Sequence, residues 1–379
     1  MSQYVFSYLY NNKYANELIL ETQKNRNVLN DISVTVVENG LILPGNSNVN
    51  NAPAWGAGGV LDADGNFIEK SGVPLAFGGK YSFNIHDIDI IDDEVIHINI
   101  IPKHWGHFLV DVVCRLWYLL ENNSQCKITY CSWKFEDHQI KGNFLEFFKI
   151  LGISEDRLVC INKPTRVKKI NIPDATYKFC GDYNEKYRTV LRKVCESVSN
   201  GNDNEISKKL YLTRTKLKKA KFYETGEKEI EDIFRLNGFE IVSPEKLSLQ
   251  QQISLFMNAE MIVSLSGTLP HNIVFTKPQT EIIILNRTCL TNLPQIGFNE
   301  LFDGRVTYID VYNRVIENKP VIYGDGPLWV ECNSNLEAWL SDNGYDQRIS
   351  KFKKIFAKIR NFCVWKMLKI VHYIYRKRK

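Results

Sequence analysis

Several short runs of this 379-residue chain carry side chains that can handle a proton or an anion. The first run is His104-Trp105-Gly106-His107, with Asp111 shortly after it. If a helix begins near Gly106, His107 and Asp111 lie four residues apart on one face. A carboxylate there would orient the imidazole and stabilise its charged form, so the pair is suited to accept a proton. The alternative is a packed histidine beside a surface aspartate.

A basic loop follows a strand expected at residues 210–213. Arg214 comes directly after that strand, and four lysines follow it, at Lys216, Lys218, Lys219 and Lys221. A guanidinium in this place could bind a diphosphate through two parallel hydrogen bonds. The alternative is a solvated basic loop without a ligand.

A glycine-containing turn follows a further expected strand, at residues 261–265. The turn reads Ser266-Gly267-Thr268-Leu269-Pro270-His271-Asn272. Its glycine permits a tight turn, its hydroxyl groups can cap a helix, and its proline suits a first helical turn. A helix start of this kind offers N–H groups to phosphate. Because ligands of open α/β sheets bind beyond the carboxyl ends of strands, this turn and the Arg214 loop predict one phosphate-binding edge.

Signatures of other chemistries are weak or missing in the sequence. Asp87-Ile88-Asp89 has the form of a divalent-metal motif, but it lies in the irregular N-terminal region, without a second histidine or carboxylate cluster at helical spacing. The sequence contains no H-E-x-x-H, no P-loop and no G-x-S-x-G. We therefore expect neither a metal nor another cofactor.

The elements that would position these groups alternate between strand and helix. Residues 91–200 predict a first domain, with strands at 95–101, 128–132 and 158–161 and helices at 106–121 and 140–151. A polar gap near residues 198–205 separates it from a second domain at 205–330. That domain has strands at 210–213, 239–242, 261–265, 281–285 and 306–311, and helices at 227–236, at 249–258 and from 270. Both alternations predict parallel sheets with helices on both faces.

Residues 1–90 read as a β-rich N-terminal extension with a strand at 32–37. The first residues lack the basic and apolar regions of a signal peptide, and the nine cysteines are scattered. No run of about 20 apolar residues could span a bilayer. We therefore expect a cytoplasmic protein.

The basic charge is concentrated at the C-terminus. From Arg348 onward there are 12 Lys or Arg and no acid, which leaves 36 basic against 43 acidic residues before it, or −7. Apolar residues recur there at steps of three and four, so 347–379 predicts a basic amphipathic helix. Residues 349–379 could bind an anionic membrane surface or simply pack on the body. Nucleic acid is a poorer partner, because no nucleic-acid-binding module is recognisable.

Four blocks of the second domain, in this order and spacing, resemble glycosyltransferase family 61. They are Lys209–Arg214, Gly238–Glu245, Ser248–Ala259 and Gly267–Asn272 followed by Phe275. The run from His104 to Asp111 is similar to the family's helix start in the first domain. The chain departs from the pattern at Lys221, at Tyr223-Glu224 and within the Gly267 turn, which bears on the identity of the donor.

The resemblance implies a GT-B-type α/β architecture, with two Rossmann-like domains facing a cleft and the nucleotide-sugar donor on the second. It implies an inverting, metal-independent glycosyltransferase of bacterial capsule or surface-polysaccharide synthesis. The basic tail adds the expectation of a lipid-linked glycan acceptor at the inner face of the membrane. His107 or Asp111 would be the base, with His104 and Trp105 beside the acceptor. Donor contacts would come from Arg214, Lys218, Ser266, Gly267, Thr268, His271 and Asn272. A pyruvyl transferase of similar fold and a non-catalytic membrane-bound assembly protein are the alternatives.

Overall fold

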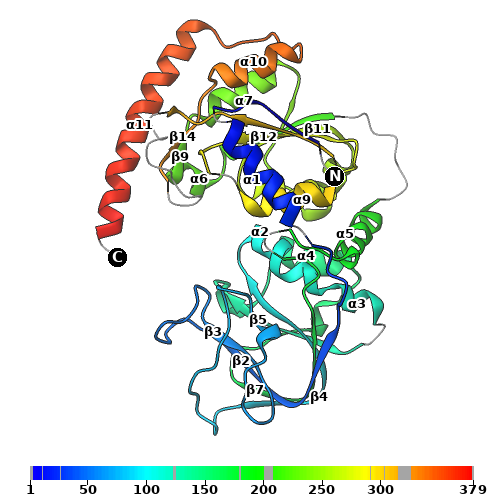
Figure 1. The fold of residues 1–379 in the computed structure, drawn as a ribbon. Coiled ribbons are helices and arrows are strands. Elements are labelled where there is room, and N and C mark those ends of the chain that lie inside the picture. Colours follow the sequence, from blue (N-terminus) through cyan, green and yellow to red (C-terminus); the bar gives the residue numbers. More distant parts are fainter. Residues whose placement is uncertain are drawn as a thin grey trace. The chain divides into compact units, whose positions relative to one another are not determined.

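A computed structural model describes residues 3–10, 12–25, 27–122, 125–178, 181–199, 208–290, 292–302, 304–314 and 326–377. The chain forms two compact units (Figure 1). Unit 1 combines residues 1–25 with residues 201–379, and unit 2 is residues 26–200. The polar gap expected at 198–205 lies mostly outside the described residues.

Unit 1 contains a six-stranded sheet whose paired strands are all parallel. Its order is β10, β8, β11, β12, β13, β1. The bounds are β1 Gln3–Tyr8, β8 Lys208–Leu212, β10 Glu240–Val242, β11 Ala259–Leu265, β12 Glu281–Asn286 and β13 Arg305–Asp310. The central strands β11 and β12 are almost continuously apolar and buried, as expected for parallel strands covered on both faces.

Helices pack on the sheet of unit 1 through clear apolar faces. In α7 (Glu227–Leu236), Ile230, Ile233 and Phe234 join a core formed with the sheet and with α10 (Ser334–Asp342). The helix begins with acidic residues and ends before Gly238, whose φ is +82°. The remaining helices are α1 Asn12–Asn25, α6 Lys218–Tyr223, α8 Leu249–Met257, α9 Leu293–Phe302 and α11 Lys351–Lys377. A short strand pair, β9 (Glu224–Thr225) and β14 (Leu328–Trp329), lies beside α11.

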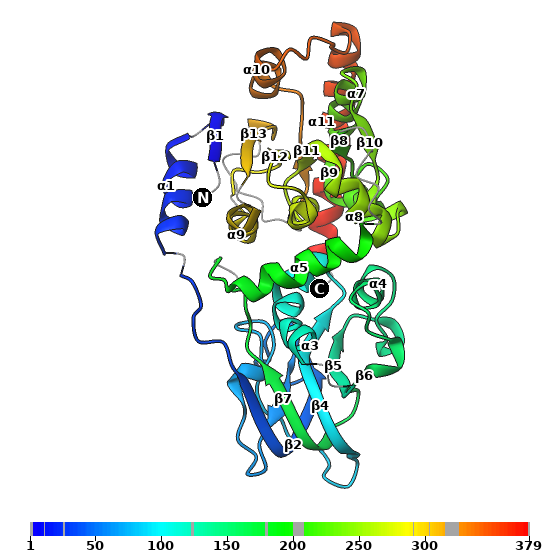
Figure 2. The ribbon, with the colours of Figure 1, turned by 90° about the vertical axis from the view of Figure 1, so that its right-hand side faces the viewer.

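Unit 2 is built on a mixed sheet (Figure 2). Its order is β3, β2, β7, β4, β5, β6, in which β2 is antiparallel to both of its neighbours and the other pairs are parallel. The bounds are β2 Val34–Asn46, β3 Ala57–Leu61, β4 Asp89–Pro102, β5 Lys127–Trp133, β6 Leu158–Cys160 and β7 Thr165–Pro173. The strands expected between residues 91 and 200 do pair in parallel, and the antiparallel β2 and β3 are added to them from the N-terminal 90 residues.

The helix expected at residues 106–121 is broken into four pieces. They are α2 Trp105–His107, a π-helix Phe108–Val112, a 3-10 turn Val113–Arg115 and α3 Trp117–Glu121. The side chain of Tyr187 donates to the carbonyl of Leu109, and that of Thr176 donates to the carbonyl of Cys114. These carbonyls are bonded from outside the helix, which interrupts the regular ladder. The other helices of unit 2 are α4 Asn143–Ile150 and α5 Glu185–Val198.

The N-terminal 90 residues are divided between the two units. Strand β1 extends the sheet of unit 1 beside β13, whereas β2 and β3 belong to the sheet of unit 2. The segment expected as an extension therefore supplies strands to both sheets. Within the described ranges, no helix has the length and apolar content needed to cross a membrane.

Candidate functional site

The strand order of unit 1 defines where a ligand should bind. In the sheet, β8 lies between β10 and β11. The chain runs from β8 to β10 on one side and then continues with β11 on the other side, so the strand order reverses between β8 and β11. Sheets of this kind bind ligands beyond the carboxyl ends of the strands at that reversal. Arg214 follows β8 and Ser266 follows β11, so both predicted motifs lie at this edge.

Two arginines meet at one buried carboxylate beyond these strand ends. Nε of Arg214 donates to Oε1 of Glu224 at 2.8 Å, and Nη1 of Arg287 donates to Oε2 at 2.5 Å. The side chains of Glu224 and Arg287 are 3% and 5% exposed, and that of Arg214 is 17% exposed. Burial alone would raise the pKa of Glu224, but the two guanidinium groups outweigh it and lower that pKa. We call these three residues the arginine clamp.

Gly267 lies directly against the arginine clamp. Its φ of +131° is a conformation that favours glycine. A Cβ atom there would lie 2.6 Å from Nη2 of Arg287 and 3.5 Å from Nη1 of Arg214. The backbone N of Arg287 also donates to Oγ of Ser266 at 3.1 Å. The missing side chain therefore lets both guanidinium groups approach the turn.

A second carboxylate lies behind Arg214. Glu227 is buried at the start of α7 and accepts from the backbone N of Arg214 at 2.8 Å. Burial and the nearby negative charge of Glu224 raise the pKa of Glu227 to about 8. At neutral pH this carboxyl group is therefore mostly protonated, so the clamp holds two positive charges against one negative charge.

The turn after β11 differs from the expected α-helix start. Residues Leu269–Phe275 form a 3-10 helix, and Thr268 does not cap it with its side chain. His271 and Asn272 are buried, and Nδ1 of His271 lies 2.7 Å from Oε1 of Gln295 on α9. These contacts make His271 part of the packing that holds the turn. Lys218 is exposed at the first residue of α6.

In unit 2 the expected histidine–carboxylate pair is formed. Nδ1 of His107 lies 3.0 Å from Oδ2 of Asp111, with the two side chains 39% and 15% exposed. The ring of His107 packs edge-on against Trp55, with 4.8 Å between ring centroids. His104 caps the turn by accepting from the backbone N of His107. Trp105 stacks on Phe108, so its ring is used in packing.

The motif at Asp87 and Asp89 forms a surface ion pair. Oδ1 of Asp87 lies 3.0 Å from Nζ of Lys163, and both side chains are largely exposed. Across the described part of the chain, no group of three or more His, Cys, Asp or Glu is placed to hold a metal ion.

Sequence analysis did not select Arg287 or Glu224 as site residues. Arg287 follows β12 as Arg214 follows β8, so the rule that directs attention to strand ends would have found it. Glu224 belongs to a two-residue strand, and nothing in its local sequence indicates that two distant arginines bind it.

Comparison with known protein families gives a match over part of the chain. Residues 105–283 match the family model described as Glycosyltransferase 61. This range contains His107, Asp111, Arg214, Glu224 and the Gly267 turn, and it ends shortly before Arg287. No curated protein matches the chain. On this match the protein is an enzyme, a glycosyltransferase, and its residues 105–283 are assigned to glycosyltransferase family 61.

Proposed function

We propose that the enzyme transfers a sugar from a nucleotide-sugar donor to a glycan acceptor with inversion at the anomeric carbon. The observation that carries the proposal is the arginine clamp at the strand-order reversal of unit 1. Guanidinium groups bind phosphate oxygens in pairs and stay charged at all physiological pH values. Arg214 and Arg287 thus supply the positive charge that a departing diphosphate needs, which supports a transfer without a metal ion.

His107 is proposed as the base and Asp111 as the residue that orients it. Its Nδ1 contacts Asp111, and no described residue forms a hydrogen bond with its Nε2. A proton on Nδ1 directed at the carboxylate leaves Nε2 with its lone pair for the acceptor hydroxyl. The neighbouring Trp55 offers an aromatic edge beside the same ring.

In the proposed reaction the acceptor hydroxyl gives its proton to Nε2 of His107. Its oxygen forms the new bond to the anomeric carbon, from the face opposite the leaving group. The bond from that carbon to the diphosphate oxygen breaks, and its electron pair leaves with the nucleoside diphosphate. General-base catalysis of this kind contributes roughly 10²- to 10⁴-fold to the rate.

The acceptor is proposed to be a lipid-linked glycan of bacterial capsule or surface-polysaccharide synthesis, at the cytoplasmic face of the cell membrane. The family and the basic C-terminal helix support this proposal. A GT-B arrangement, in which donor and acceptor bind to different domains, is also proposed, and the match to family 61 supports it.

The test is release of nucleoside diphosphate by the purified chain from a panel of nucleotide sugars, with and without glycan acceptors. Release of inorganic phosphate from a pyruvyl donor instead would contradict the proposal. Matched reactions with Arg214→Ala and with Lys216→Ala separate the clamp from the basic loop around it, because Lys216 is exposed.

A further inference from the structure

The C-terminal helix α11 has one face that is already occupied. Asn361, Trp365, Leu368 and His372 are buried and recur at steps of four, three and four. Nε1 of Trp365 donates to the carbonyl of Pro327 at 3.2 Å, and Nε2 of His372 lies 3.0 Å from the carbonyl of Phe222. We call these four residues the inner face. This face attaches the helix to unit 1.

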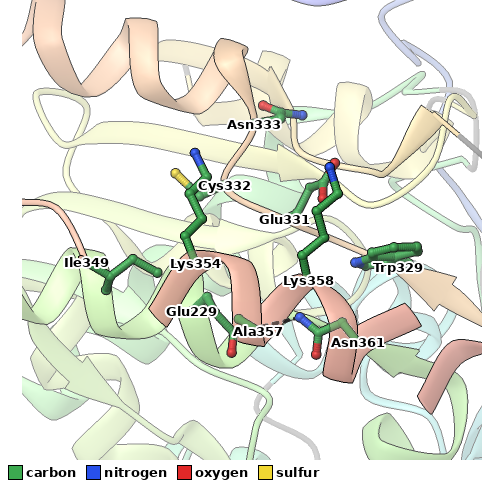
Figure 3. A pocket seen from close by; sticks show the side chains of 10 residues that line it. All are labelled: Glu229, Trp329, Glu331, Cys332, Asn333, Ile349, Lys354, Ala357, Lys358 and Asn361. Atoms are coloured by element: carbon green, nitrogen blue, oxygen red, sulfur yellow. Dashed lines mark hydrogen bonds between the residues drawn. The ribbon is translucent and has the colours of Figure 1, made fainter. Parts of the chain in front are cut away.

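A cavity of about 270 Å³ lies where the first half of α11 meets α7 and β14 (Figure 3). Beside it, Nδ2 of Asn361 donates to Oε2 of Glu229 at 3.1 Å. Arg360 pairs with the same Glu229, and Lys354 pairs with Glu337 on α10. These polar contacts add to the buried ones, so the orientation of α11 about its axis is fixed by several independent bonds.

The opposite face of α11 is apolar and exposed. Ile359, Met367 and Ile370 each lie two residues from an inner-face residue, which is about 200° around a helix. Phe352, Ile359 and Ile370 are 70%, 59% and 61% exposed. We call the following residues the outer face: Phe352, Ile355, Phe356, Ile359, Met367, Ile370 and Ile374. Ile349, the first residue of the segment 349–379 that was expected to bind a membrane, packs instead on the core of unit 1.

Lysines border the outer face. Within the described ranges, six lysines of α11 form no ion pair, namely Lys351, Lys353, Lys358, Lys366, Lys369 and Lys377. The helix carries no acidic residue that could neutralise them. Packing on unit 1 does not account for these unpaired lysines or for the exposed outer face, because the buried residues of α11 are those of the inner face.

We propose that the outer face of α11 docks on an anionic lipid bilayer, an inference that deepens the membrane location in the proposed function and rests on it. The charge pattern selects this partner, because apolar side chains enter the acyl boundary while lysines on both borders meet anionic headgroups. An exposed apolar stripe of this length is rare on soluble chains without such a role. The helix lies along the bilayer surface, and the inner face stays attached to unit 1.

Vesicle binding by the full-length chain tests this inference without requiring activity. Vesicles of phosphatidylcholine alone are compared with vesicles that also contain phosphatidylglycerol, by co-sedimentation and by tryptophan fluorescence. The double variant Ile359→Gln/Ile370→Gln should bind the anionic vesicles at least about thirtyfold more weakly. Leu236→Gln at the end of α7 is the matched control, since Leu236 is an apolar residue outside α11 that is 52% exposed.

Removal of charge should act separately from removal of apolar surface. Lys353→Gln and Lys366→Gln should each weaken anionic-vesicle binding about fivefold, and added salt should remove this difference. All variants should unfold in urea as the wild type does, because none alters the inner face.

Three results would overturn the inference. They are unchanged binding by the isoleucine variant, equal binding to neutral vesicles, and self-association through the outer face without vesicle binding. The last result would identify a second copy of the chain as the occupant. If the full chain binds the vesicles but shows no transferase activity, only the proposed function is contradicted.

Discussion

Replacement of Glu227 by glutamine should flatten the pH dependence of stability. The pKa of Glu227 is raised from 4.5 to about 8, because the group is buried and lies near Glu224. Between those values the native state binds one proton more than the unfolded state. The stability that this group contributes is therefore complete below about pH 4.5 and is lost as the pH rises to about 8.

The size of the effect follows from that window. Each pH unit inside it removes about 1.4 kcal/mol from the free energy of unfolding of the wild type. In Glu227→Gln the amide oxygen can still accept from the backbone N of Arg214, but no charge has to be buried. From about pH 6 to about pH 7 the variant should therefore lose about 1.4 kcal/mol less than the wild type.

The measurement is urea unfolding of the full chain at several pH values. The transition to analyse is the one whose urea midpoint changes when nucleoside diphosphate is added. Other titrating groups cancel in the comparison, because they are common to both proteins. Glu231→Gln is the matched control on the same helix. Burial would raise the pKa of Glu231, but hydrogen bonds from Lys228, Thr215, Arg235 and Thr213 lower it to about 2.

The contribution of Glu231 is present above its ordinary pKa of 4.5 and is lost as the pH falls toward about 2. Its glutamine variant should be less stable than the wild type at neutral pH, with an unchanged slope between about pH 6 and about pH 7. Equal slopes for the wild type and Glu227→Gln would refute the account of the buried carboxyl group.

Further predictions concern the transfer itself. Arg214→Ala should weaken binding of nucleoside diphosphate by about 1.5–3 kcal/mol, measured by calorimetry, and Arg214→Lys should lose less because the charge remains. Arg287→Ala should lower the urea midpoint more than Arg214→Ala, because Arg287 is the more buried partner of Glu224. His107→Ala and Asp111→Asn should each reduce turnover about 10²-fold or more, and the double variant should be little worse than the poorer single one. Activity should persist in EDTA. If EDTA instead abolishes activity and manganese restores it, Asp87 and Asp89 are indicated as metal ligands.

The regular elements of unit 1 were predictable because their patterns are strong. Helix α7 has the bounds expected from its apolar spacing, and the buried runs of β11 and β12 read as central strands. Strand β7 was missed, because Arg166, Lys168 and Lys169 interrupt the apolar pattern of a strand that is paired on both sides. The break within 106–121 depends on Tyr187 and Thr176, which are distant in sequence.

The candidate site was only partly predictable for a similar reason. The His107–Asp111 pair is a local pattern at helical spacing, and the structure forms it. Arg214 was expected to bind a diphosphate, but its contact with the buried Glu224 was not foreseen. The expected phosphate-binding helix start is instead a short 3-10 segment whose His271 is used in packing. Such roles depend on tertiary partners that no local pattern encodes.

Few residues separate the segment that α11 contacts from the arginine clamp. His372 contacts the carbonyl of Phe222, and Asn361 contacts the side chain of Thr225. Between these two lies Glu224, which holds both arginines. If docking on lipid restrains α11 and thereby this segment, the bilayer acts as an effector of donor binding. Reciprocity then requires that a bound nucleotide sugar tighten the hold on the membrane by the same factor.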